Sequence, residues 1–155
     1  MKKHLTPGFT LVELLVVIAI LGIISAIAMP TYNRYIERGY LSQAHAELVS
    51  INNGFKNELI KNPKWTNTEI ETELSSYLEE FSGDPTIAEK YSYSGAVINK
   101  DKSRRYHLTA TPNDGTGYTW AVAMDSLGNA YKCPEAELAE NFLTEQTISG
   151  SCEKF

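Results

Sequence analysis

The chain opens with an apolar segment that is long enough to cross a membrane. Residues 9 to 29 are apolar apart from Thr10, Glu13 and Ser25. As a helix that rises about 1.5 Å per residue, this segment is roughly 30 Å long, which is the thickness of a bilayer core. Lys2 and Lys3 precede it, so the N-terminus is expected to stay cytoplasmic while the C-terminal part of the chain crosses.

Three interpretations of this segment compete. A secretory signal peptide would be cut after Ala28, but the apolar stretch is longer than usual and Pro30 lies just beyond the cut. A plain membrane anchor explains the length and leaves Glu13 unexplained, because an unpaired carboxylate in lipid costs about 2.5–3.5 kcal/mol. The third interpretation, a retained helix in which Glu13 has a function, accounts for both features.

Beyond the apolar segment, the hydrophobic period is that of an amphipathic helix. Pro30 is predicted to interrupt the helix, since it lacks an N–H group and its ring clashes with the carbonyl four residues back. The helix then resumes, and Asn62-Pro63 ends it. Polar residues, Asn52 and His45 among them, are assigned to the other faces. Apolar residues recur at steps of three and four along one face: Leu41, Ala44, Leu48, Ile51, Phe55 and Leu59.

The second half of the chain changes to the period of two that is typical of strands. Residues 66 to 78 are expected to form one or two short helices with Thr66 as the cap, and Pro85 to start a helical turn through Lys90. Strands joined by short turns indicate an antiparallel sheet that can lay one face on the long helix. The predicted strands are Tyr91–Val97, Tyr106–Thr111, Tyr118–Met124 and Ala130–Cys133, with turns at 113–117 and 125–129.

The residues around the start of the apolar segment resemble a prepilin signature. A short basic stretch ends in Gly8, Phe9 follows, and Glu13 is the fifth residue counted from Phe9. This pattern identifies the chain as a member of the type IV pilin family. The resemblance implies that a prepilin peptidase cuts between Gly8 and Phe9, and that Phe9 is N-methylated. Glu13 can then neutralise the Phe9 ammonium of a neighbouring subunit, because a buried charge is tolerated when it is paired.

The two cysteines, Cys133 and Cys152, lie near the C-terminus. If the apolar segment leads to export, the pair meets an oxidising compartment and a disulfide is expected; two free buried thiols are the alternative. The enclosed segment resembles the disulfide-bounded region at the pilin C-terminus. Its pattern predicts a small amphipathic helix with an acidic outer face. The candidate contact residues between pili are Glu137, Glu140, Asn141 and Glu145.

Charge and motifs narrow the function classes. The formal net charge of −5 argues against nucleic acid as the main partner, and the one basic cluster, residues 100 to 105, reads as a solvated turn. No P-loop, metal-protease motif, nucleophile elbow or dinucleotide fingerprint is present, and His4, His45 and His107 have no ligand spacing. The sequence thus predicts no catalytic, cofactor-binding or metal-binding residues.

The predicted fold is α+β: a type IV pilin fold with a long N-terminal helix on an antiparallel sheet and a C-terminal disulfide-bounded region. The expected parts are a leader (1–8), a membrane and filament-core helix (9–29), an amphipathic half-helix (30–62), a head (63–132) and the C-terminal region (133–155). In pilins, the stretch around Pro30, from about Gly22, can lose helical form inside the filament.

Within the family, the chain resembles minor pilins that promote bacterial aggregation and adhesion. The expected partners are the prepilin peptidase, major and minor pilins in a filament, and the same subunit on opposing pili. The resemblance implies an inner-membrane precursor and an extracellular pilus afterwards. The alternatives are a pseudopilin of a type II secretion system and another minor pilin that serves pilus assembly or DNA uptake.

Overall fold

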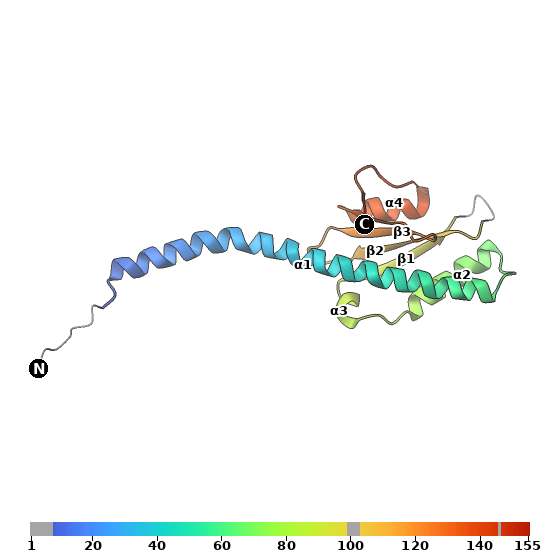
Figure 1. Cartoon of the computed structure of the whole chain (residues 1–155), viewed down its shortest axis with the longest axis horizontal. Helices are drawn as coiled ribbons and strands as arrows, with labels where there is room; N and C mark the ends of the chain where they lie inside the picture. The colour runs from blue at the N-terminus through green and yellow to red at the C-terminus, as the bar shows by residue number, and fades with distance from the viewer. Residues whose placement is uncertain (1–7, 99–102, 146) are drawn as a thin grey trace, which may run out of the picture. The chain divides into compact units, whose positions relative to one another are not determined.

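The computed structural model describes residues 8–98, 103–145 and 147–155. The chain divides into two compact units, Met1–Ile36 and Glu37–Phe155. The helix α1, Leu11–Lys61, begins in the first unit and ends in the second (Figure 1). The remaining elements all belong to the second unit, which is called the head below.

The described part of the first unit consists mainly of the apolar half of α1. Within α1, an 18-residue window reaches a mean hydropathy of 2.8, and none of it is buried. Large apolar side chains are exposed along this half-helix, from Leu11 at 81% to Met29 at 72%. A helix of this length and composition can cross a membrane.

Pro30 lies inside a continuous helix, so the predicted interruption at this residue is wrong for the isolated subunit. Pro30 removes a single backbone donor, while an unwound segment would leave several carbonyls without partners. The Thr31 hydroxyl donates to the carbonyl of Ile27 at 3.2 Å and adds a hydrogen bond next to the proline. The loss of helix around residues 22 to 30 within a filament stays a prediction.

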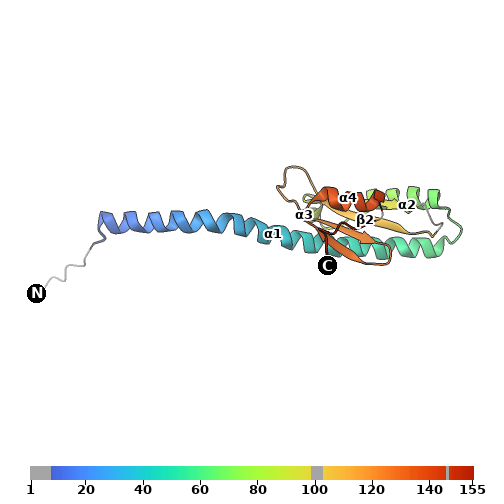
Figure 2. The same cartoon turned by 90° about the horizontal axis from the view of Figure 1, so that it is seen from above.

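The head is built on a five-stranded antiparallel sheet in the order β1-β2-β3-β4-β5. Its strands are β1 (Tyr91–Val97), β2 (Tyr106–Pro112), β3 (Ala121–Asp125), β4 (Ala130–Cys133) and β5 (Glu153–Lys154). Residues 37–61 of α1 pack on one face, and α4, Ala136–Glu145, covers the other (Figure 2). The predicted α+β architecture is confirmed.

The main core lies between α1 and the sheet. The apolar stripe of α1 is buried as predicted from Leu41 at 4% to Phe55 at 1% exposure, whereas its last member, Leu59, is half-buried. Tyr106, Leu108 and Ala110 face this stripe from alternate positions of β2. Asn52, which the sequence placed on a solvent face, is buried because its side-chain oxygen accepts a 2.7 Å hydrogen bond from the Tyr106 hydroxyl.

Two helices connect α1 to the sheet on the same face. The helix α2, Asn67–Glu80, starts with a capping box between Thr66 and Glu69. The short α3, Pro85–Ala88, follows Asp84, whose carboxylate accepts from the Thr86 N–H. Both were expected from the sequence, within a few residues at their ends.

The sheet differs from the prediction in two places. Strand β3 begins at Ala121 and not at Tyr118, because the N–H groups of Thr119 and Trp120 bond to the Glu37 carboxylate. The short β5 was not predicted, and it pairs with Tyr131 and Lys132 of β4. The sheet therefore holds the chain directly after Cys152, in addition to the disulfide.

Candidate functional site

The start of α1 is organised by Glu13 and Thr10. One carboxylate oxygen of Glu13, Oε2, accepts from both the N–H and the hydroxyl of Thr10 at 2.8 Å. The Thr10 hydroxyl in turn accepts from the Glu13 N–H at 3.3 Å. These bonds cap the helix, whose first N–H groups otherwise lack partners. Within the described residues, the other oxygen, Oε1, accepts no hydrogen bond and stays available.

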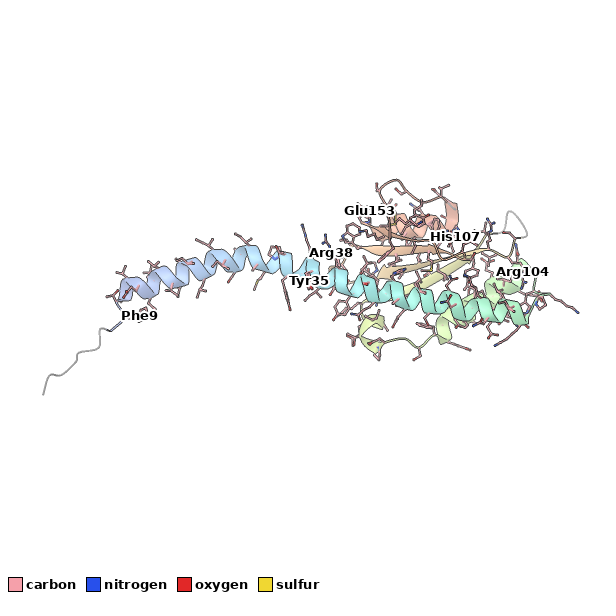
Figure 3. All side chains as sticks on the ribbon, viewed as in Figure 1. Phe9, Tyr35, Arg38, Arg104, His107 and Glu153 are labelled. Atoms are coloured by element: carbon pink, nitrogen blue, oxygen red, sulfur yellow. A yellow bond between two sulfur atoms is a disulfide. The ribbon has the colours of Figure 1, made fainter. Side chains whose placement is uncertain are left out.

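The predicted cleavage point lies just before this cap. Gly8 is exposed, and a Cβ atom added to it would meet nothing within 4 Å. Phe9 is 82% exposed and precedes the first turn of α1 (Figure 3). The peptide bond between Gly8 and Phe9 is thus accessible to a peptidase.

A disulfide joins Cys133 and Cys152 and closes the segment that contains α4. The free-thiol alternative does not apply. Buried Ala139 and Phe142 seat α4 on the sheet beside Ala121 and Ala123. A covalent link at the ends and an apolar contact in the middle therefore fix this segment on the head.

His107 of β2 contacts α4 through both a ring stack and a hydrogen bond (Figure 3). Its ring lies parallel to the Phe142 ring with centroids 3.9 Å apart. Its Nδ1 donates to the Phe142 carbonyl at 2.8 Å, which fixes the tautomer because a carbonyl can only accept. That carbonyl belongs to the last turn of α4, so His107 caps the C-terminal end of the helix.

The surroundings of His107 oppose its protonation. Burial lowers the pKa of His107, and this effect outweighs the Phe142 carbonyl and the Asp125 carboxylate, which both raise the pKa. The imidazole is therefore neutral under ordinary conditions and helps to pack α4 on the sheet.

The candidate contact residues lie together on α4. Glu137, Glu140 and Glu145 are exposed, and Asn141 is half-buried. Among the described residues, the only ion pairs are Lys61–Glu58 and Lys132–Glu153. The outer side of α4 therefore presents unpaired carboxylates to solvent.

Sequence reasoning missed two glutamates that anchor loops to α1. Glu37 accepts the N–H groups of Thr119 and Trp120 at 2.6 and 2.9 Å. Glu47 accepts the Asp84 N–H and the Tyr93 hydroxyl, each at 2.6 Å. Glu37 lies four residues before Leu41, in line with the apolar stripe, and this spacing could have indicated that Glu37 faces the core.

Burial and the Glu47 carboxylate together raise the pKa of the Tyr93 hydroxyl, so the hydroxyl keeps its proton and remains a donor.

No group of three or more metal-binding side chains comes together within residues 8–98, 103–145 and 147–155. Of the basic cluster, residues 100 and 102 lie outside the described residues.

Comparison with known proteins decides the family. The family description "Minor type IV pilin, PilX" matches residues 34–155. The chain belongs to the PilX family of minor type IV pilins. A second description, "Prokaryotic N-terminal methylation motif", matches residues 7–29 and covers the predicted processing site.

Solved and curated relatives agree with this assignment. The crystal structure of the minor type IV pilin PilX from Neisseria meningitidis is 41% identical, with a TM-score of 0.67, and covers 77% of this chain and 99% of that one. The fimbrial protein EcpB of Eikenella corrodens is 30% identical over 89% of this chain and 72% of its own length.

The type IV major fimbrial protein FimA of Dichelobacter nodosus is 52% identical over 60 residues, which is 39% of this chain and 35% of FimA. The chain thus matches about a third of the length of that relative. As a member of a pilin family with a methylation motif, the chain is a minor type IV pilin that is made as a membrane-anchored precursor.

Proposed function

We propose that this minor pilin enters the type IV pilus and promotes bacterial aggregation and, through it, adhesion. The observation that carries the proposal is the PilX family match over the whole head, combined with an exposed helix that a disulfide holds on the outside of the sheet. We also propose that the chain has no catalytic activity.

Processing precedes assembly in this proposal. The prepilin peptidase cuts after Gly8, and Phe9 becomes the methylated N-terminus. Residues 9–29 anchor the precursor in the inner membrane with the N-terminus cytoplasmic, as expected from Lys2 and Lys3. The accessible Gly8–Phe9 bond supports this order of events.

Assembly with major and minor pilins then depends on Glu13. In the single subunit, its Oε2 already bonds to Thr10, while Oε1 accepts nothing within the described residues. A neighbouring Phe9 ammonium can therefore be neutralised without breaking the cap of α1. Since a buried ion pair forms at only one axial stagger, the contact also sets the register between subunits.

The contact between pili is assigned to α4. The disulfide, Phe142 and His107 fix the helix, so little conformational entropy is lost when its outer side binds. Rigid presentation of exposed polar side chains is what a contact element requires. The proposed contact set is Glu137, Glu140, Asn141 and Glu145.

The test replaces these four residues with serine and keeps both cysteines. The matched control replaces three exposed carboxylates of α2, Glu71, Glu73 and Glu79, with serine. We expect both variants to enter sheared pili at the wild-type level, and only the α4 variant to lose clumping. Unchanged clumping of the α4 variant contradicts the assignment, and equal loss in both variants reduces it to a general charge effect.

A further inference from the structure

A pocket in the head lies between the end of α1 and the helix α2, which returns beside it (Figure 2). Its volume of about 330 Å³ lies within the range of about 300–1,000 Å³ that is typical of small-molecule sites. Side chains from both helices and from the connection between them line this α1–α2 pocket. Among them are Phe55, Glu58, Trp65, Glu73, Tyr77 and Glu80.

Helical spacing places these side chains together. Glu73, Tyr77 and Glu80 follow one another at steps of four and three, so they lie on one face of α2. Phe55 and Glu58 lie three residues apart near the end of α1. Both sets line the same pocket, so the two helix faces are turned toward each other.

Aromatic rings form part of the wall of the α1–α2 pocket. Trp65 and Tyr77 are half-buried, so each ring still presents surface to the pocket. The Tyr77 ring packs edge-on against the buried Phe55 ring, with centroids 5.6 Å apart. The Tyr77 hydroxyl lies so close to α1 that it occupies the position of a Cβ atom at Gly54, where only glycine leaves this space. The Tyr77 ring is therefore held in place by α1 before any ligand arrives.

The polar part of the wall is anionic. Glu73 and Glu80 are exposed, and neither belongs to an ion pair among the described residues, whereas Glu58 is paired with Lys61 at 2.7 Å. Within the part of the chain that the structure describes, no three carboxylates come together closely enough to hold a metal ion. The carboxylates of this pocket are therefore spaced for a larger cation.

A methylated ammonium group has the matching chemistry. Its positive charge is attracted to the face of an aromatic ring, and tryptophan is the best such partner. Aromatic walls are the usual way in which proteins bind quaternary ammonium groups. A primary ammonium is compact and strongly hydrated, so it loses more of its hydration when it enters a partly aromatic pocket.

We propose that the α1–α2 pocket binds a methylated ammonium group of the kind that choline carries. The Trp65 and Tyr77 rings contact its methyl groups, while the Glu73 and Glu80 carboxylates balance its charge. No residue of this pocket belongs to α4, so the inference goes beyond the proposed function and does not depend on it.

The test titrates the full chain, in a sugar-headed detergent, with tetramethylammonium, and the NMR signal of its methyl protons reports binding. Trp65→Leu removes an aromatic face and should weaken binding about 2- to 30-fold, which corresponds to one cation–π contact. Glu73→Gln with Glu80→Gln keeps the shape of the pocket and removes charge, so it should also weaken binding. Glu71→Gln with Glu79→Gln makes the same charge change on α2 outside the pocket and should bind like the wild type.

The glutamine pairs keep the test decisive. Trp65 also packs against the core, so circular dichroism first checks that each variant is folded, and the pocket pair decides alone if Trp65→Leu is not. Binding that the pocket pair leaves unchanged overturns the inference. Equal weakening in both glutamine pairs does the same, because it indicates a general charge effect, and so does a wild-type chain that shows no binding.

Further probes define the ligand. Methylammonium, a primary ammonium, should bind more weakly than tetramethylammonium, and equal affinity overturns the assignment to a methylated ammonium. Similar affinities for choline and glycerophosphocholine support the site and assign it to a choline head group, while binding of choline alone supports it and assigns it to a free methylated amine. Failure of every probe, with clumping still dependent on α4, overturns this inference and leaves the proposed function untouched.

Discussion

Replacing His107 with alanine is expected to loosen α4 while the sheet and α1 stay folded. The imidazole stacks on Phe142 at 3.9 Å and donates to the Phe142 carbonyl at 2.8 Å. The stack is worth about 0.5–1.5 kcal/mol and the hydrogen bond about the same, so their loss amounts to about 1–3 kcal/mol. The disulfide keeps α4 attached, so the effect is local opening of the helix.

Hydrogen exchange measures this opening directly. At one tenfold change per 1.4 kcal/mol, the amides of α4 should exchange about 5- to 150-fold faster in His107→Ala, while those of β2 and β3 change much less. His107→Phe keeps an aromatic ring on Phe142 and removes only the donor, so it should show the smaller effect of about 1 kcal/mol. Unchanged α4 exchange in His107→Ala would refute the assignment of His107 as one of the contacts that hold the helix.

The same residue gives a pH dependence. Burial holds the pKa of His107 below its ordinary value of 6.5, so the folded state binds fewer protons than the unfolded one. The stabilisation is complete above about pH 6.5 and is lost as the pH falls toward the lowered pKa. Burial also lowers the pKa of His45, so the difference between wild type and His107→Phe in urea unfolding isolates His107. A difference that does not shrink on acidification contradicts this account.

Three further changes test other parts of the molecule. Glu13→Val should insert normally in the membrane, because an insertion penalty of about 2.5–3.5 kcal/mol disappears. It should be scarce in sheared pili, because the Phe9 ammonium then has no partner. Equal immunoblot signals in membranes and pili would argue against the pairing. Replacing Cys133 and Cys152 together with alanine should cost about 3 kcal/mol, because the cross-link spans 19 residues, and an unchanged urea midpoint would show otherwise. Glu37→Ala leaves two backbone N–H groups without a hydrogen-bond acceptor and should lower the free energy of unfolding by about 2–4 kcal/mol. Glu37→Gln should lower it by about 1 kcal/mol in the same urea assay. Equal losses would mean that these hydrogen bonds do not contribute to stability.

Local patterns in the sequence predicted much of the fold. The stripe of α1, the capping box at Thr66 and four of the five strands depend on neighbouring residues, which a single sequence displays directly. The two-residue β5 has no pattern of its own, because its stability comes from pairing with β4. The helix of the C-terminal region was predicted because the apolar and acidic residues that form its two faces lie within one short segment.

Buried polar residues were harder to predict, because their partners are distant in the sequence. Glu37 bonds to a loop 82 residues away, Asn52 meets Tyr106 and His107 meets Phe142. No local rule distinguishes such a residue from a solvated one before the chain is folded. Pro30 shows the opposite error, because a strong local preference was outweighed by the long helix on both sides of it.

The intact mass of the subunit recovered from sheared pili tests the central claim most directly. The expected mass is that of residues 9–155 with one methyl group on Phe9 and one disulfide between Cys133 and Cys152. This result requires leader cleavage, methylation, export and entry into the filament in the same molecule. A subunit that begins at Met1 or Met29, or a subunit that is found in membranes and never in pili, would contradict the account.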